Sequence, residues 1–143
     1  MTGIVLAFDY GLRRIGVAVG SRLTGSARAL APLKARDGVP DWSLVGRLIA
    51  EWKPARVLVG LPLNMDDTPS EMSERACRFG RRLEGRFQVP CEMIDERLSS
   101  FVARSLIAES GIRASTDSVA ACLILETWLA AAPDAGETGQ RLP

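Results

Sequence analysis

An apolar stretch near the start of the chain constrains the fold most, because it leads directly into a carboxylate. The residues from Ile4 to Phe8 are all apolar, and Asp9 and then Gly11 follow them. A continuous apolar run of this length, bounded by turn residues, is typical of a strand buried on both faces. We therefore predict a central strand that ends at Asp9, with this carboxylate at the edge of a sheet. The alternative is a purely local role in the turn, where aspartate often hydrogen-bonds to the backbone.

Two more strands are predicted from the residues that follow. Ile15–Gly20 is a second apolar run after a short link that contains Gly11, which favours an antiparallel hairpin with the first strand. Ser26–Leu33 alternates loosely between apolar and polar residues and is a third candidate. Pro32 restricts that part of the strand to a sheet edge or a strand end.

Length and composition predict a single soluble domain. The chain has 143 residues, of which 47% are hydrophobic and 24% are charged, and no apolar run is long enough to cross a bilayer. The first strand begins without an export signal before it, so we expect a cytoplasmic protein with no membrane partner. We expect the domain over residues 1–132 and a disordered tail over residues 133–143, which are small and polar.

The absence of histidine limits the chemistry available to the chain. It excludes Ser-His-Asp and Cys-His catalysis and every metal site with histidine ligands. The three cysteines, Cys77, Cys91 and Cys122, lie far apart and indicate reduced, buried thiols instead of a zinc site or a disulfide framework. The net charge of +1 indicates no general basic coat for nucleic acid, although arginines gathered on one surface remain compatible with such a partner.

The middle of the chain alternates helices with strands. Asp41 is a candidate N-cap for a helix that Pro54 ends, and Arg56–Gly60 is a short apolar strand expected to lie parallel to the first. Thr68–Glu71 combines a capping hydroxyl, a proline and a glutamate in the order that begins a second helix. Pro90–Glu96 is a further strand that ends in acids. This order predicts an α/β domain with a mixed sheet.

Two stripes of side chains follow the second helix. Apolar residues recur at helical spacing and predict the face turned to the core: Met72, Ala76, Phe79 and Leu83. Arginines recur about 100° around the helix from them: Arg75, Arg78 and Arg82. A solvated face and a face that binds phosphates are both compatible with this arginine stripe.

The C-terminal part contributes two more helices and another acid. Ser99 or Ser100 can cap a helix that runs to about Glu109, and a last helix begins at Asp117. Asp117 shares a helix face with residues expected to be buried: Ala120, Ala121, Ile124 and Trp128. The two alanines would let the helix approach the strand ends and carry Asp117 to them, whereas a favourable interaction with the helix dipole is the alternative role for this acid. Glu126 falls on the opposite side, so we assign it to solvent.

Carboxylates on three separate elements are therefore predicted to meet. Parallel strands that end in acids bring those ends to the same edge of a sheet, so Asp9 is expected near Asp95 or Glu96. Successive residues of a strand face opposite sides, so only one of those two acids can join Asp9. The strand pattern does not choose between them.

The same segments resemble a known family. They are, in chain order, Phe8–Gly11 with Arg14–Val19, Gly60–Asp66, Asp95–Ser99, and Asp117–Ala121 with Ile124–Glu126. Together they look like the bacterial pre-16S rRNA nuclease family, also described as Holliday junction resolvase-like proteins. The resemblance extends from about Ile4 to Leu129.

The resemblance implies a ribonuclease H-like α/β fold, with a mixed five-stranded sheet flanked by helices. It also implies an acidic site of Asp9, Glu96 and Asp117, and so selects Glu96 over Asp95. This chain departs from the family between Gly111 and Asp117, where many members have a longer loop rich in lysine. The acids are intact, and the departure concerns the substrate contacts near the last of them.

Three carboxylates gathered in one place favour a bound cation. They repel one another by roughly 4 kcal/mol per pair at about 4 Å near a protein surface, and a divalent ion relieves that repulsion. Mg²⁺ and Mn²⁺ prefer oxygen ligands and keep positions open for water and phosphate. Two such ions could activate a water and stabilise the departing oxygen of a phosphodiester. We assign Asp9, Glu96 and Asp117 to metal binding and, through the metal, to catalysis.

Further residues near the acids are candidates for holding substrate. Arg13, Arg14 and Arg97 flank the acids in sequence and could bind phosphates by paired hydrogen bonds, with ordinary surface ion pairs as the alternative. Asn64 follows a strand end on the side of Asp9 and could line the site, or belong to a structural turn.

The function that the resemblance implies is a metal-dependent nuclease that processes the 5′ end of precursor 16S rRNA in ribosome biogenesis. Its partner would be that RNA, free or in a ribosomal precursor particle. The same acids could serve a resolvase of branched DNA, which would need two active sites paired in a dimer. A non-catalytic RNA-binding factor in ribosome assembly is a third alternative. An actin-like ATPase domain is a fourth, but such proteins enclose ATP between two domains and this chain supplies one.

Overall fold

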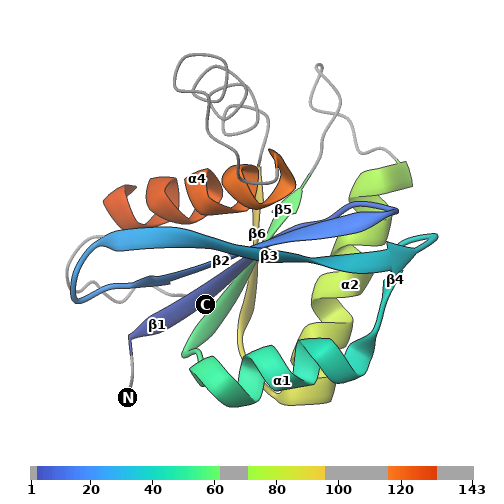
Figure 1. Ribbon diagram of the computed structural model, residues 1–143, viewed down its shortest axis with the longest axis horizontal. Coiled ribbons are helices and arrows are strands. Elements are labelled where there is room, and N and C mark those ends of the chain that lie inside the picture. Colours follow the sequence, from blue (N-terminus) through green and yellow to red (C-terminus); the bar gives the residue numbers. More distant parts are fainter. Residues whose placement is uncertain (1–2, 62–70, 96–115, 132–143) are drawn as a thin grey trace.

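A mixed β-sheet lies between helices on both of its faces (Figure 1). The computed structural model describes residues 3–61, 71–95 and 116–131. The elements are, in chain order, β1 (Ile4–Asp9), β2 (Arg14–Ser21), β3 (Ser26–Arg36), β4 (Val39–Pro40), α1 (Trp42–Trp52), β5 (Arg56–Leu61), α2 (Glu71–Phe87), β6 (Cys91–Asp95) and α4 (Thr116–Ala131). Helices α1 and α2 cover one face of the sheet, and α4 covers the other (Figure 1).

Strand β1 occupies a central position, as predicted. The strands lie in the order β4-β3-β2-β1-β5-β6. β1 pairs antiparallel with β2, with Asp9 opposite Gly16, and parallel with β5, with Phe8 opposite Val59. β5 in turn pairs parallel with β6. The C-terminal ends of β1, β5 and β6 therefore meet at one edge of the sheet, and the predicted hairpin and parallel pairing are confirmed.

The sheet has one strand more than the five that we expected. The additional strand, β4, has only two residues and pairs with the end of β3. A two-residue turn joins them, in which Asp37 and Gly38 both have positive φ angles, of 51° and 82°. Asp-Gly is a preferred pair for such a turn, because its backbone twist matches that of the flanking strands. The turn signal was present in the sequence, but two residues are too few to show the alternation that predicts a strand.

Pro32 lies inside β3, where a bulge accommodates it. Ile15 pairs with Leu33 and Val17 with Leu30, so the register shifts by one residue between these two pairs. Two residues of β3, one of them Pro32, therefore lie opposite the single residue between Ile15 and Val17. Because the ladder is interrupted at a bulge, the missing N–H of proline costs less there than in a regular strand.

Side chains of β1 alternate between two buried clusters, one on each face of the sheet. Leu6 and Phe8 belong to the cluster under α1 and α2, called here the α1/α2 cluster, whereas Val5 and Ala7 belong to the α4 cluster. Other fully buried members of the α1/α2 cluster are Ile15, Val17, Val45, Val57, Val59, Ala76 and Leu83. The α4 cluster also contains Ala18, Leu58, Ala121 and Leu125. The sheet is thus buried on both faces, as its apolar strands predict.

Helix α1 begins at the predicted cap, and both helices of the α1/α2 face pack as the sequence predicts. Asp41 caps α1, and its Oδ1 accepts hydrogen bonds from the hydroxyl and the N–H of Ser43 at 2.6 and 3.0 Å. The side-chain hydrogen bond from Ser43, followed by the backbone one, holds the pKa of the Asp41 carboxyl below its usual value. The predicted core residues of α2 all contact the α1/α2 cluster: Met72, Ala76, Phe79 and Leu83.

Several predictions fall outside the described residues. They are the cap at Thr68, the helix expected from Ser99 or Ser100 to Glu109, the departure from the family after Gly111, and the tail over residues 133–143. None of the described helices is both long enough and apolar enough to span a membrane.

Candidate active site

Asp9 closes β1 at the edge where the parallel strands end. Its side chain is partly buried, and it continues the alternation of Val5 and Ala7, so it belongs to the α4 side of the sheet. The chain turns sharply just afterwards. The turn is so tight that a Cβ atom at Gly11 would overlap the carbonyl oxygen of Arg14. The predicted position of Asp9 at the sheet edge is confirmed.

The first turn of α4 is fixed to the sheet beside β1. The hydroxyl oxygen of Ser118, a residue only 1% exposed, accepts a hydrogen bond from the backbone N–H of Val17 at 3.2 Å. Val17 lies opposite Phe8 of β1 and next to Gly16, the partner of Asp9. The Val17 N–H that donates this hydrogen bond thus lies where the bulge interrupts the ladder between β2 and β3.

The opposite end of α4 is held by the indole of Trp128. Its Nε1 donates a hydrogen bond to Oε1 of Glu92 in β6 at 3.2 Å. The guanidinium of Arg22 lies 4.7 Å from the centre of the indole ring, and that of Arg56 lies 5.9 Å from it. Cations over an aromatic face are attracted to it. Contacts near both ends of α4, together with the buried alanines between them, therefore fix the position of the helix on the sheet.

Asp117 directly precedes Ser118 in the first turn of α4. The anchored serine therefore brings the backbone at this position to the region of Asp9, although the side chain of Asp117 lies outside the described part of the structure. Glu126, which we assigned to solvent from its place on the helical wheel, is exposed, and this prediction is confirmed.

The alternation of β6 bears on the choice between Asp95, the last residue of the strand, and Glu96, which follows it. Cys91 and Met93 pack against the α1/α2 cluster, whereas Ile94 packs against the α4 cluster and Glu92 bonds to Trp128 of α4. Even-numbered residues of β6 thus face α4, the side to which Asp9 belongs. Glu96 has the same parity but lies outside the described residues, as do Asn64 and Arg97.

Oxygen atoms are the suitable metal ligands in this chain. Histidine is absent, and burial raises the pKa of the Cys91 thiol to about 12, with the charge of Glu84 as a second cause. Burial likewise raises the pKa of Cys122 to about 11, so both cysteines remain protonated at neutral pH. Among the described residues, no three acids or cysteines gather closely enough to hold a metal ion. The carboxylate set predicted at this edge still suits a hard cation such as Mg²⁺ or Mn²⁺.

Two of the predicted arginines lie in the turn that follows Asp9. Arg13 and Arg14 are both exposed, and Arg14 begins β2. The carbonyl oxygen of Arg13 accepts a hydrogen bond from the N–H of Ala35 at 2.8 Å, which ties the turn to β3. Both arginines therefore belong to the same edge of the sheet as Asp9, where a charged substrate could reach them.

Comparison with known proteins identifies the family. The sequence matches the model of the RuvX family, described as Holliday junction resolvase, over residues 3–131. The chain belongs to the RuvX family. A protein named "Putative pre-16S rRNA nuclease" from Azotobacter vinelandii is 56% identical over 135 residues, covering 91% of this chain and 95% of the relative. A protein of the same name from Pseudomonas putida is 55% identical, covering 90% of this chain and 95% of the relative.

Solved structures confirm the fold expected of a RuvX family member. Thermus thermophilus RuvC in complex with a Holliday junction superposes with a TM-score of 0.54 and 17% identity, covering 90% of this chain and 96% of that one. The fowlpox virus Holliday junction resolvase gives a TM-score of 0.51 with 13% identity, covering 87% and 94%. At such low identity the likeness concerns the fold alone. It confirms the predicted ribonuclease H-like α/β architecture.

Two side chains that position α4 in this RuvX family member were not predicted from the sequence. Ser118 was not singled out, although a small polar residue within a buried, alanine-rich helix face signals a hydrogen bond to the backbone of a neighbouring element. Glu92 was also missed, because its partner Trp128 is 36 positions away and only the tertiary structure brings them together.

Proposed function

We propose that this chain is a metal-dependent nuclease that processes the 5′ end of precursor 16S rRNA, with Asp9, Glu96 and Asp117 as its acidic site. The observation that carries the proposal is the hydrogen bond between Ser118 and Val17, because it sets the first turn of α4 beside the strand end that bears Asp9. The RNA substrate follows from the names of relatives more than 50% identical over nearly their whole length. Phosphodiester hydrolysis also agrees with the family to which the chain belongs.

Each of the three acids has a separate structural argument. Asp9 ends the central strand on the α4 side of the sheet. Asp117 lies in the helical turn that Ser118 anchors. Glu96 shares the parity of the two β6 residues that face α4, Glu92 and Ile94. Three carboxylates from three elements can hold Mg²⁺ or Mn²⁺, and such ions, when bound, lower the pKa of a water and stabilise charge on the departing oxygen.

Arginines and an amide would hold the substrate around these acids. Arg13 and Arg14 extend from the turn after Asp9, and a guanidinium binds two phosphate oxygens in a planar, paired geometry. Arg97 and Asn64 follow the ends of β6 and β5 in sequence and would contact phosphate or sugar of the substrate. Their roles are to orient the phosphodiester, which lowers the entropy cost of the reaction.

The proposed setting is ribosome biogenesis in the cytoplasm. The partner would be precursor 16S rRNA, free or within a ribosomal precursor particle. The described helices give no membrane span, and the relatives carry a name that refers to ribosomal RNA.

A resolvase of branched DNA is the second candidate function. The description of the RuvX family as Holliday junction resolvase favours it. The same acids would serve either substrate, because both reactions cleave a phosphodiester bond. Symmetric cleavage of a four-way junction additionally requires two active sites in a dimer.

A cleavage assay with matched variants tests the proposal. Mg²⁺ or Mn²⁺ is titrated into reactions with a structured 5′ fragment of precursor 16S rRNA and, separately, with a four-way DNA junction. We expect metal-dependent cleavage of the RNA, reduced by roughly 10²-fold or more in Asp9→Asn and Asp117→Asn, as for the loss of one electrostatic contact in an active site. Glu126→Gln removes an exposed acid of the same helix and should retain wild-type activity.

Other outcomes of this assay separate the candidates. Preferential cleavage of the junction, with the same loss in both aspartate variants, would favour the resolvase. RNA binding without cleavage of either substrate under any metal concentration would contradict both nuclease functions and favour a non-catalytic assembly factor. Equal loss in Glu126→Gln would show that the assay reports the stability of α4 instead of catalysis.

A further inference from the structure

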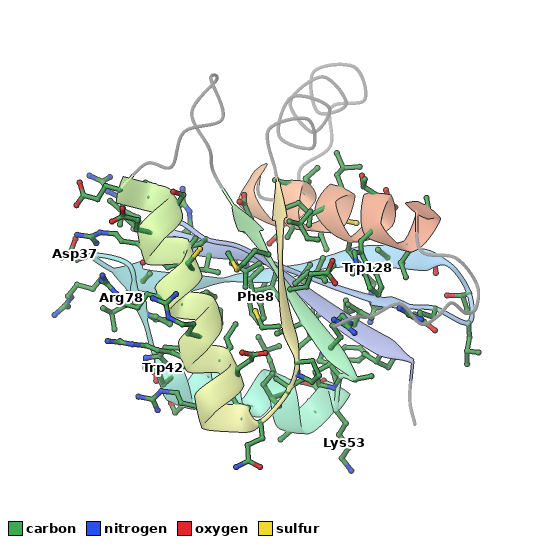
Figure 2. The ribbon with its side chains drawn as sticks, turned by 180° about the vertical axis from the view of Figure 1, so that it is seen from behind. Phe8, Asp37, Trp42, Lys53, Arg78 and Trp128 are labelled. Carbon is green, nitrogen blue, oxygen red and sulfur yellow. The ribbon has the colours of Figure 1, made fainter. Side chains whose placement is uncertain are left out.

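A pocket of about 250 Å³ lies on the α1/α2 face of the molecule, away from α4. Its walls are the turn between β3 and β4, the start of α1 and one side of α2. The aromatic side chains of Tyr10, Trp42 and Phe79 line it together with Arg75, Arg78 and Arg82. In Figure 2, Asp37, Arg78 and Trp42 lie along the same side of the molecule, and Trp128 lies across the sheet from them. We call it the arginine–aromatic pocket.

The aromatic side chains of this pocket pack against one another. The ring centroid of Phe79 lies 5.3 Å from that of Tyr10 and 5.7 Å from that of Trp42, distances typical of packed aromatic pairs. The hydroxyl of Tyr10 donates a hydrogen bond to the carbonyl oxygen of Gly38 at 2.8 Å. This bond fixes the turn between β3 and β4 to the end of β1. Tyr10 and Phe79 are buried, whereas Trp42 is partly exposed.

The charge around the pocket is positive. Arg75 is engaged with two acids, Asp37 at 3.4 Å and Glu71 at 3.6 Å. Within the described segments, no carboxylate lies in ion-pair distance of Arg78 or Arg82, and both side chains are exposed. This leaves two guanidinium groups beside an aromatic ring. Such a combination suits a ligand with both anionic groups and planar rings.

A fourth arginine extends the positive stripe along α2. The guanidinium of Arg86 lies 4.5 Å from the centre of the Trp42 ring. Arginines at positions 75, 78, 82 and 86 thus follow one side of the helix for about three turns, or roughly 16 Å at 1.5 Å per residue. A linear ligand with regularly spaced anionic groups can contact several of them at once.

The size of the pocket argues against an enclosed small molecule. Pockets that enclose a drug-sized ligand measure roughly 300–1,000 Å³, and this one is smaller. It has room for part of a ligand, such as one base, while the remainder lies along the arginines outside. A single strand of nucleic acid has this form, since its bases are free to stack and its phosphates follow at regular intervals.

The pocket also lies next to the candidate active site. Tyr10 lines it and directly follows Asp9, and the two residues face opposite sides of the sheet because strand residues alternate. Helix α2 begins near the edge where the parallel strands end (Figure 1), so Arg75 and Arg78 lie closer to that edge than Arg82 and Arg86. A strand bound along α2 could therefore continue around the end of β1 to Asp9.

We propose that the arginine–aromatic pocket binds a single-stranded segment of the RNA substrate next to the cleavage site. Arg78 and Arg82 bind its phosphates, and Trp42 stacks on one base. The identity of the ligand as RNA rests on the proposed function, whereas the pocket and its charge do not. The site makes the arginine stripe of α2 a phosphate-binding face, one of the two alternatives that the sequence leaves open.

The test measures RNA binding without cleavage. Binding of a labelled single-stranded RNA of about 12 nucleotides is followed by fluorescence anisotropy in EDTA, with the full chain. The variant Arg78→Ala/Arg82→Ala is compared with Arg47→Ala/Arg81→Ala, which removes two exposed arginines outside the pocket. We expect the Kd to rise by about tenfold or more in the first and by less than about twofold in the second. Loss of two phosphate contacts should also reduce the slope of log K against log salt by about 1.4.

Tryptophan fluorescence provides an independent readout. We expect RNA to quench the intrinsic fluorescence of the wild type, and the quenching to disappear in Trp42→Phe, which retains the other two tryptophans. Phenylalanine preserves an aromatic wall, so this variant should fold. An unchanged quenching in Trp42→Phe would contradict the stacking role of Trp42.

The outcomes separate this inference from the proposed function. Equal affinities in the two double variants would overturn the pocket as an RNA site, even if the wild type cleaves precursor rRNA. Pocket-dependent RNA binding by a wild type that cleaves nothing would uphold the pocket and contradict the nuclease. If an acidic peptide of glutamates bound with the same arginine dependence and RNA did not, the pocket would be a protein-binding site and the proposal would be wrong.

Discussion

The two faces of the sheet are built from side chains of different size. On the α4 face, the alanines Ala7, Ala18 and Ala121 share one buried cluster, so helix and sheet approach closely. On the other face, aromatic and branched residues such as Phe8, Phe79 and Leu83 fill the space under α1 and α2. Where helix and sheet approach closely, the position of the helix can vary little. A larger core, in contrast, buries more apolar area and so contributes more to stability.

This difference corresponds to the two kinds of site on the molecule. The proposed acidic site needs residues from a helix and two strand ends within the reach of one metal ion, and the close packing of α4 supplies that accuracy. The arginine–aromatic pocket needs a charged, partly open surface, and longer side chains on α2 supply it. A change of packing should therefore affect activity more on the α4 face than on the α1/α2 face.

Enlarging an alanine on each face gives the largest expected effect. Ala121 and Ala76 are both fully buried, and each lies in the second turn of its helix. We expect Ala121→Leu and Ala76→Leu each to lower the free energy of unfolding by about 3 kcal/mol, since overpacking forces neighbours apart. Urea unfolding measures this loss. Of the two, only Ala121→Leu is expected to move α4 away from the sheet. Under conditions where this variant is folded, its cleavage rate should fall by about tenfold or more, as expected for a displacement of the helix near 1 Å.

The Ala76→Leu variant is the control for stability. It should retain cleavage within about twofold of the wild type at a temperature where both variants are folded. If both variants lost activity equally, the distinction between the two faces would be wrong, and stability alone would explain the loss.

Two glycines allow a second, smaller test. A Cβ atom at Gly20 of β2 would lie 2.8 Å from the backbone oxygen of Ser26 and 2.9 Å from Cδ2 of Leu125 in α4. The backbone cannot move without disturbing the hairpin between β2 and β3. We therefore expect Gly20→Ala to lower the free energy of unfolding by about 1–2 kcal/mol, as measured by urea unfolding.

Gly80 of α2 is the matched position on the other face. A Cβ atom there would lie 3.0 Å from Sγ of Cys91 and 3.1 Å from Sδ of Met93, whose side chain is flexible. Alanine also favours a helix by about 1 kcal/mol over glycine, which offsets the tight contact. Gly80→Ala should therefore leave the stability within about 0.5 kcal/mol of the wild type. A larger loss in Gly80→Ala than in Gly20→Ala would reverse our view of which helix packs with less tolerance.

The cysteines give the smallest effect, which appears only at alkaline pH. Burial raises the pKa of Cys91 to about 12 and that of Cys122 to about 11, from the usual 9.0. At pH 8 their thiolates should be about 1,000-fold and 100-fold rarer than in an unfolded chain. Alkylation by iodoacetamide, located by mass spectrometry, should therefore reach Cys122 before Cys91, with the urea-unfolded protein as the control.

The raised pKa values of the two thiols also determine how these groups change the stability of the folded protein with pH. The folded-state pKa of each thiol lies above its unfolded value, so its contribution to stability is complete below pH 9 and is lost as the pH rises toward 11 for Cys122 and 12 for Cys91. Cys91→Ala should flatten the decline in stability above pH 9. An unchanged decline in that variant would assign the effect to other groups.

Much of the fold was predictable because its signals are local. The apolar run before Asp9, the cap at Asp41 and the apolar spacing of α2 each depend on neighbouring residues, and each prediction is confirmed. Strand β4 was missed, since a two-residue strand exists only through its partner β3. The bulge opposite Gly16 was missed for the same reason, because register is a property of two strands.

The candidate site divides in the same way. The sequence by itself determined which acids are available, that no histidine can take part, and that Asp9 ends a buried strand. Only the tertiary structure decided that the N–H of Val17 donates a hydrogen bond to Ser118, and that Tyr10, Trp42 and Arg78 line one pocket. The physical reason is distance along the chain. A local pattern reports the face on which a side chain lies, whereas the partner on that face, 101 positions away for Val17, is chosen by the packing of whole elements.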